Sequence, residues 1–310
     1  EFALGDRIAS KADKVNKSVR IAVAVATGVV LIGILAWPLA APPEPSGAVS
    51  LLDSTISLGD AITLAILAFL AGLIAYFLSW PYGREIGILA APSGLAIWAV
   101  RCGSMAGLMQ RTAPAQRQAL FATIKWEPVF WLAIVAAGFA GVLLAQKISG
   151  RKVEPVASKG KSNSRLNMYL NTAVALVGSV LIAQFCITIF AQDVRMLDDQ
   201  LRRLVVAQPA VGQVVFAVLL SFGLAAFVVK AFLNVSYIWP TIASALVTAF
   251  AITIYVKQDV LQHLVERHPA ALFSNAVIAI LPVQMVAFGT LGSIAGYWMA
   301  VRYIYWRKHA

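Results

Sequence analysis

Long apolar runs separated by short polar segments set the pattern of this chain. Each run is close to the roughly 20 residues that an α-helix needs to cross the hydrocarbon core of a bilayer. The runs do not alternate between apolar and polar residues, which excludes the strands of a transmembrane β-barrel. We therefore predict an all-α integral membrane protein with about eight transmembrane helices. The expected spans are Ile21–Ala41, Ala61–Trp80, Ile86–Met109, Val129–Gln146, Leu166–Ala191, Val211–Val229, Ile238–Val256 and Ala276–Val301.

The polar segments between the runs share a spacing of four residues. In the segment from Asp193 to Ala210, this spacing separates Leu201, Val205 and Pro209. It recurs at Leu261, Val265 and Pro269, at Leu120, Ile124 and Pro128, and in a degraded form at Leu52, Ile56 and Asp60. Residues four apart lie on one face of a helix. We therefore predict helical hairpins joined by short amphipathic helices on the membrane surface.

The second half of the chain resembles a tandem duplication. The residues from Ile187 to Val194 are similar to those from Ile252 to Val260, once a small gap is allowed. Each copy would contain two spans, so the copies would share one orientation. The alternative is that apolar helices built from few residue types match by chance.

The run Ile86–Met109 has two interpretations, because it contains Pro92-Ser93-Gly94 and then Arg101. It either crosses the membrane or enters and returns on the same side, which would leave seven helices plus a re-entrant segment. Eight spans place 16 of the 25 Lys and Arg residues on one side and 8 on the other, with Arg101 inside a span. The excess of Lys and Arg on the cytoplasmic side of membrane proteins favours eight spans with both termini cytoplasmic.

Composition supports the membrane interpretation and gives a role to the net charge. Of the 310 residues, 60% are hydrophobic and 13% charged, the mean hydropathy is +0.80 and the formal net charge is +11. The basic residues lie beside the apolar runs, where they attract anionic lipid headgroups, so we expect no nucleic-acid partner. Compact loops suit a bacterial cytoplasmic (inner) membrane.

Charge and flexibility divide the chain into five parts. Residues 1–20 form a basic amphipathic helix on the membrane surface, and residues 21–147 form a first half with four helices. Residues 148–165 are a flexible basic linker, rich in Gly, Ser and Lys. Residues 166–301 form a second half made of two similar hairpins, and residues 302–310 are a basic tail.

Arg101 is the one clear charge inside the expected spans. Ionisable residues within a membrane are costly and often functional. Arg101 would then be a fixed positive charge in a protein-lined cavity, beside a helix break at Pro92-Ser93-Gly94. Alternatively its long side chain extends to the membrane surface.

Two uncharged polar residues, Gln184 and Gln284, also lie within spans. Such residues form hydrogen bonds between helices more often than they bind substrate. Gly289, Gly292 and Gly296 follow each other at spacings of three and four, which is typical of a face where two helices pack closely.

No catalytic motif and no cofactor or metal site is expected. Asp259, His263, Glu266 and His268 lie together on one surface segment, but two ligands on one short helix make a poor zinc site without a third. All three histidines lie outside the spans, which argues against haem ligation in the membrane. We expect no enzyme activity.

Two functions remain from the sequence alone. One is a non-catalytic multi-pass subunit of a larger membrane assembly, with a scaffold or channel-lining role and with other subunits or copies of itself as partners. The other is a transporter or permease for an anion or a neutral lipid-like solute, because ion-coupled carriers generally use carboxylates within the membrane and the spans contain none.

Overall fold

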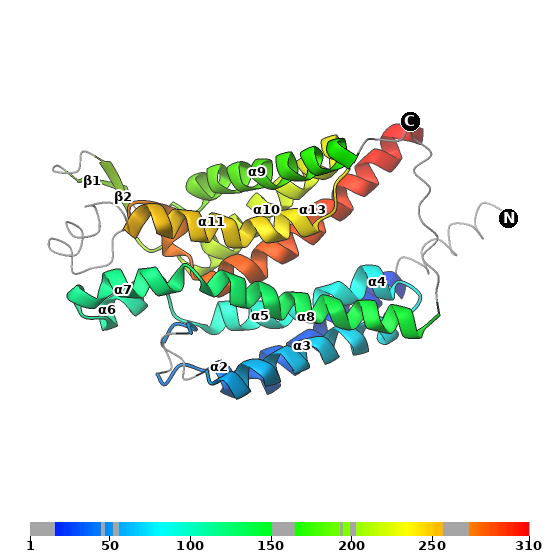
Figure 1. Ribbon diagram of the computed structural model, residues 1–310, viewed down its shortest axis with the longest axis horizontal. Helices are drawn as coiled ribbons and strands as arrows, with labels where there is room; N and C mark the ends of the chain where they lie inside the picture. The colour runs from blue at the N-terminus through cyan, green and yellow to red at the C-terminus, as the bar shows by residue number, and fades with distance from the viewer. Residues whose placement is uncertain are drawn as a thin grey trace. The chain divides into compact units, whose positions relative to one another are not determined.

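The computed structural model describes residues 16–44, 47–51, 56–150, 165–192, 195–198, 203–256 and 273–309. The described chain is mainly α-helical, with one short β-hairpin (Figure 1). After a first helix, Asn16–Leu35, the elements are α2 (Trp37–Ala40), α3 (Leu58–Leu78), α4 (Gly83–Ile86), the 3-10 helix η2 (Gly87–Leu89), α5 (Ala90–Arg101), α6 (Met105–Arg111), α7 (Pro114–Ile124), α8 (Glu127–Ile148), α9 (Arg165–Phe190), β1 (Arg195–Asp198), β2 (Arg203–Val206), α10 (Val211–Leu233), α11 (Ile238–Val256), the 3-10 helix η3 (Ala276–Ala279) and α13 (Pro282–His309).

Six of the described helices are long and apolar enough to cross a membrane. They are Asn16–Leu35, Leu58–Leu78, Ala119–Ile148, Tyr169–Phe190, Val211–Leu233 and Ile238–Val256. The pair Gly83–Arg101 and Met105–Arg111, bent by 54°, adds a seventh if it forms a single broken span. These helices are those of an all-α membrane protein, and the count of eight stays a prediction.

The chain divides into two compact units. Unit 1 contains Glu1–Leu39, Ser57–Ile97 and Ala133–Val156, and unit 2 contains Ala40–Ile56, Trp98–Leu132 and Ala157–Ala310. Helices α5 and α8 therefore contribute residues to both units. The linker expected at residues 148–165 lies almost wholly outside the described residues, as does most of the surface helix expected at residues 1–20.

In unit 1, local chemistry starts α3 and small residues position it against α8. Ser57 caps the helix, because its hydroxyl accepts the Asp60 N–H while the Asp60 carboxylate accepts the Ser57 N–H at 3.0 Å. Further along, the backbone of α3 contacts α8 at glycines, where a Cβ on Gly72 or Gly141 would overlap the backbone of the other helix.

Helices α3 and α8 run parallel. Phe69 on α3 contacts Gly141 on α8, and nearer the end of each helix the Tyr76 and Ser149 hydroxyls lie 2.8 Å apart. The order of these contacts is the same along both helices. If α3 and α8 both cross a membrane in the same direction, the chain between them has to cross back.

In unit 2, α13 packs along α10 more extensively than on any other described helix. These two helices are also parallel, since Gly292 contacts Leu219 and Gly296 contacts Gly223 one turn later. Helix α11 runs in the opposite sense to α13 (Figure 1). The region expected as a separate tail at residues 302–310 continues α13 as far as His309.

The described part of the segment from Asp193 to Ala210 is a β-hairpin, so the prediction of an amphipathic surface helix there was wrong. Strand β1 pairs antiparallel with β2, from Arg195 opposite Val206 to Asp198 opposite Arg203. Val206 also pairs with Phe273, both of its backbone hydrogen bonds being 2.8–2.9 Å long. Val205 and Val206 are β-branched, and such residues favour extended backbone. The pairing with Phe273 provides hydrogen-bond partners for the Val206 N–H and carbonyl.

The shared spacing of four does not correspond to one shared structure. Leu120 and Ile124 lie in α7, whereas the segment from Leu201 to Pro209 contains β2. The copies beginning at Leu261 and Leu52 lie wholly or partly outside the described residues. The tandem duplication of the second half therefore stays a prediction.

Replacing a glycine at the α10–α13 contact should destabilise the protein. In Gly296→Ala the new Cβ would overlap the Gly223 backbone, so the free energy of unfolding should fall by about 1–3 kcal/mol. Gly178→Ala on α9 is the matched control, because a Cβ there meets no atom within 4 Å. Its stability should be unchanged or higher by up to about 1 kcal/mol, since alanine is the better helix former. Thermal unfolding in detergent measures both, and equal melting temperatures would contradict the close packing.

Candidate functional site

The candidate site is built around the break between α5 and α6. Helix α5 ends at Arg101, and Ser104 starts α6 by accepting the Gly107 N–H with its hydroxyl at 3.1 Å. The break separates carbonyl groups at the end of α5 and N–H groups at the start of α6 from their usual helical partners. In an apolar environment each such group costs free energy until it finds another partner.

Gln284 supplies one set of partners. Its side-chain Nε2 donates to the Ala99 carbonyl at 3.0 Å, and its Oε1 accepts the Leu281 N–H at 3.1 Å. The side chain is only 2% exposed. One amide therefore joins the last turn of α5 to the start of α13.

Gln208 supplies the other set. Its Oε1 accepts the Ala106 N–H in the first turn of α6 at 3.1 Å, and its Nε2 donates to the Ala279 carbonyl of η3 at 3.0 Å. We call Gln208 and Gln284, with their backbone partners at Ala99, Ala106, Ala279 and Leu281, the glutamine seam. The seam lies within unit 2 and joins two interrupted helices, α5–α6 and η3–α13.

A buried carboxylate lies in the first turn of α8, also in unit 2. The Glu127 side chain is 1% exposed, and its Oε1 accepts hydrogen bonds from the Ser50 hydroxyl and from the Leu51 N–H, the latter at 2.9 Å. A negative charge in the first turn of a helix interacts favourably with the helix dipole. Together with the hydrogen bond from Gly103 N–H to the Gly47 carbonyl, Glu127 fixes the segment 47–51.

Arg117 is a second buried charged residue in unit 2. Its side chain is 5% exposed, and its Nε donates to the Thr112 carbonyl at 3.2 Å. Sequence reasoning missed Gln208, Glu127 and Arg117, because all three lie in segments between spans that were expected on the membrane surface. Only Glu127 carried a signal, namely an acidic residue next to Pro128 at the start of an apolar run.

The structure separates the predicted break from Pro92. The helix is continuous from Gly83 to Arg101, and its 3-10 turn η2, Gly87–Leu89, contains the carbonyl that an N–H at Pro92 would otherwise bind. The break expected at Pro92-Ser93-Gly94 is therefore wrong, and the chain is interrupted at Cys102–Ser104 instead. Gly94 lets α5 approach Gly28 of the first helix within unit 1.

The other predicted residues lie in three environments. Arg101 is exposed at the end of α5, and Gln184 is half-buried on α9, where its side-chain amide makes no hydrogen bond to the described residues. Gly289, Gly292 and Gly296 lie on the face of α13 that contacts α10 and α11. Of the predicted polar residues, Gln284 is the one that the structure brings into the seam.

The chemistry of the glutamine seam is that of neutral hydrogen-bonding groups. Amides and backbone groups donate and accept hydrogen bonds but do not serve as acid, base or nucleophile at neutral pH. Among the described residues, no three His, Cys, Asp or Glu side chains are grouped closely enough to hold a metal ion. The surface segment with Asp259, His263, Glu266 and His268 lies outside those residues.

No family model, curated protein or solved structure matches this chain.

Removing the Gln284 amide should destabilise the protein more than removing the Gln184 amide. Gln284→Leu leaves the Leu281 N–H without its partner and the Ala99 carbonyl without one of its donors, at a cost of about 1–3 kcal/mol for a buried group. Gln184→Leu removes an amide with no described hydrogen bond and should change stability by less than about 0.5 kcal/mol. Thermal unfolding of the two variants in one detergent measures the difference. A Gln184→Leu effect as large as that of Gln284→Leu would contradict the role of the seam.

Proposed function

We propose that this protein is a non-catalytic multi-pass subunit of a larger membrane assembly, with a scaffold or channel-lining role. The observation that carries the proposal is the use of the two side-chain amides in the seam, of which Gln284 is buried and Gln208 half-buried. Both ends of the Gln284 amide bind the backbone of the chain itself, as do both ends of the Gln208 amide. Polar groups used in this way maintain a structure, and no enzyme activity forms part of the proposal.

Helix packing supports the same role. Glycines bring α3 against α8 and α10 against α13 at backbone distance, which is how membrane helices gain van der Waals contact without a hydrophobic driving force. The other faces of α9 remain apolar and open, with Phe185 and Leu181 more than 60% exposed. Such faces are available to lipid and to neighbouring subunits or further copies of this chain.

The proposal includes an eight-span topology in a bacterial cytoplasmic membrane, with both termini cytoplasmic. Its support is the parallel packing of α3 and α8, because the chain between them must then cross the membrane once, and the bent pair α5–α6 is the available crossing. The parallel packing of α10 and α13, with α11 between them in the chain, supports α13 as the eighth span by the same reasoning. The basic residues at the cytoplasmic end would contact anionic lipids.

A second candidate function is transport of an anion or a neutral lipid-like solute. The specific observation that favours it is that two interrupted helices, α5–α6 and η3–α13, meet at the seam. Transporters commonly place their binding sites at interrupted helices, where backbone groups are free to contact a substrate. In this chain the glutamines bind those groups, which is why the subunit role ranks first.

Native mass spectrometry after gentle detergent extraction from the source membrane tests the subunit role. We expect the chain to be released in a stoichiometric complex with other membrane proteins, which proteomics on the same sample identifies. Release as a lone monomer would contradict the proposal, and release as a small homo-oligomer would exclude other membrane proteins as the partners. Uptake of labelled anions and lipids into proteoliposomes would then test the transporter.

Cysteine accessibility separates the two topologies. Single cysteines at Lys17, Gln110 and Lys308, each exposed, would be introduced after Cys102 and Cys186 are replaced by alanine. With eight spans, a membrane-impermeant maleimide should label positions 17 and 308 from one side and position 110 from the other. With seven spans and a re-entrant segment, positions 17 and 110 would share a side and position 308 would lie opposite, which would contradict the proposed topology.

A further inference from the structure

A lysine at the end of α10 is held between polar and aromatic groups from three parts of unit 2. The Lys230 Nζ donates to the Asn234 side-chain oxygen at 2.7 Å and lies 4.9 Å from the centre of the Tyr297 ring on α13. Tyr297 in turn contacts Tyr237, which lies just before α11, edge to face at 5.5 Å. We call Lys230, Asn234, Tyr237 and Tyr297 the lysine cradle.

The backbone at the end of α10 places the residues of the lysine cradle close together. Helix α10 ends at Leu233 and is capped by Asn234, whose left-handed conformation (φ 52°) suits an asparagine and lets its N–H bond to the Lys230 carbonyl. The chain then turns directly into α11, so Asn234 and Tyr237 remain close to the Lys230 side chain. The exposed hydrogen bond to Asn234 and the Tyr297 ring therefore hold the ammonium group near the end of α10.

The cradle orients the charge of Lys230 without neutralising it. Asn234 and the tyrosine ring are both uncharged, and Lys230 forms no ion pair with the residues that the structure describes. Lys230 is the one charged residue of α10 and α11, and further charges at this end of the unit include Arg302, Arg307 and Lys308 in the last turns of α13. An ammonium group has three N–H donors, so two remain after the bond to Asn234.

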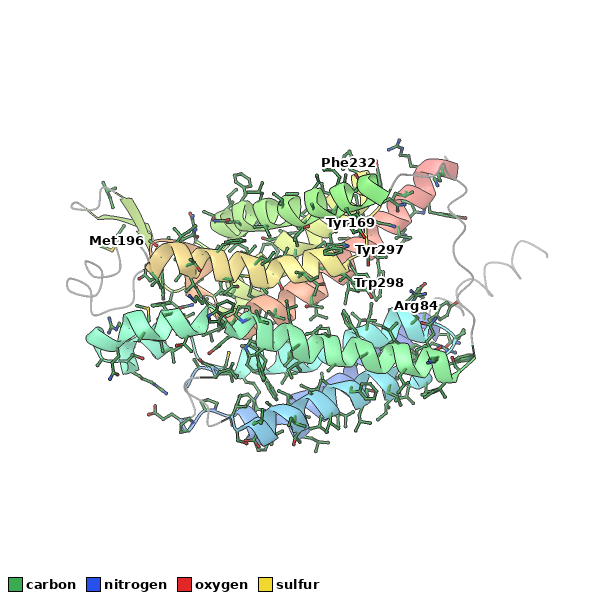
Figure 2. All side chains as sticks on the ribbon, viewed as in Figure 1. Arg84, Tyr169, Met196, Phe232, Tyr297 and Trp298 are labelled. Carbon is green, nitrogen blue, oxygen red and sulfur yellow. The ribbon has the colours of Figure 1, made fainter. Side chains whose placement is uncertain are left out.

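The surroundings are those of a membrane interface. Figure 2 shows Tyr169, Phe232, Tyr297 and Trp298 at the end of unit 2 where α10 finishes. Phe232 is 82% exposed and Tyr169 is 66% exposed. Aromatic residues gather at the level of lipid headgroups, where one part of the ring is apolar and another part meets water.

We propose that the lysine cradle binds the phosphodiester of an anionic phospholipid. The remaining N–H donors of Lys230 would contact the phosphate oxygens, and the exposed aromatic side chains would contact the glycerol and the upper acyl chains. A lipid fits better than a soluble phosphate because the charge lies among exposed aromatic residues at the end of membrane-crossing helices. This inference goes beyond the subunit role and needs only the placement of α10 in a membrane.

The test measures lipid retention. The purified protein is reconstituted in nanodiscs with equal amounts of phosphatidylglycerol and phosphatidylcholine, and native mass spectrometry counts each lipid that stays bound after release. Wild type should retain phosphatidylglycerol in preference to phosphatidylcholine. Lys230→Gln should reduce that preference about fivefold, which corresponds to about 1 kcal/mol for one lysine at a membrane surface.

Three further variants, two of them controls, make the test specific. Lys147→Gln removes a lysine from the last turn of α8 that lacks the ring and side-chain contacts described for Lys230, and it should reduce the preference clearly less than Lys230→Gln does. Tyr297→Leu should weaken it, because the ring that orients the ammonium is lost, whereas Tyr297→Phe should keep it, because the contact uses the face of the ring. Thermal unfolding of every variant in the same nanodiscs verifies that the fold is retained.

Any one of three outcomes would overturn the proposal. Lys230→Gln could retain phosphatidylglycerol as wild type does, or Lys147→Gln could lose as much as Lys230→Gln, which would indicate general attraction to the surface. Displacement of the lipid by millimolar inorganic phosphate would assign the cradle to a soluble anion. Each outcome is independent of whether the protein is released alone or in a complex.

Discussion

A backbone N–H or carbonyl group that leaves a helix in an apolar environment must find another partner, and unit 2 depends on how this requirement is met. Helix α5 breaks before α6, and η3 breaks before α13. Gln208 and Gln284 bind backbone groups on both sides of these breaks. Without the two amides, backbone groups in four chain segments would each lose a hydrogen-bond partner. Two side chains thus make two interrupted helices compatible with a buried position.

The regular helices are held together by a different effect. Between apolar helices in lipid there is little hydrophobic driving force, so close contact has to come from van der Waals packing. The glycines of α3, α8 and α13 provide it, since a single Cβ at Gly72, Gly141 or Gly296 would collide with backbone. Small residues and side-chain amides therefore have different structural roles. The first positions whole helices, and the second permits helices to be interrupted.

The helical membrane class and most helix positions were predictable from the sequence, because a long apolar run carries its own signal. The expected bounds of α11, Ile238–Val256, agree with the structure. The hairpin β1–β2 was not predictable, since Val206 becomes a strand residue by pairing with Phe273, far away in the sequence. Gln284 was identified because it is polar within an apolar run, whereas Gln208 and Glu127 lie at the ends of runs, where polar residues are common. In all three cases the partners come from distant segments, which local patterns do not reveal.

The bond between Gln284 and Ala99 joins residues 185 positions apart, and this distance has a consequence for biosynthesis. At 5–20 residues per second, the ribosome needs about 10–40 s to reach Gln284 after it has made Ala99. During that time α5 and α6 are already present, but the side chain that joins them to α13 has not been synthesised. Until Gln284 has been made, the Ala99 carbonyl at the end of α5 lacks this hydrogen bond. Helix α13 thus completes a hydrogen bond whose other member, in α5, is made much earlier.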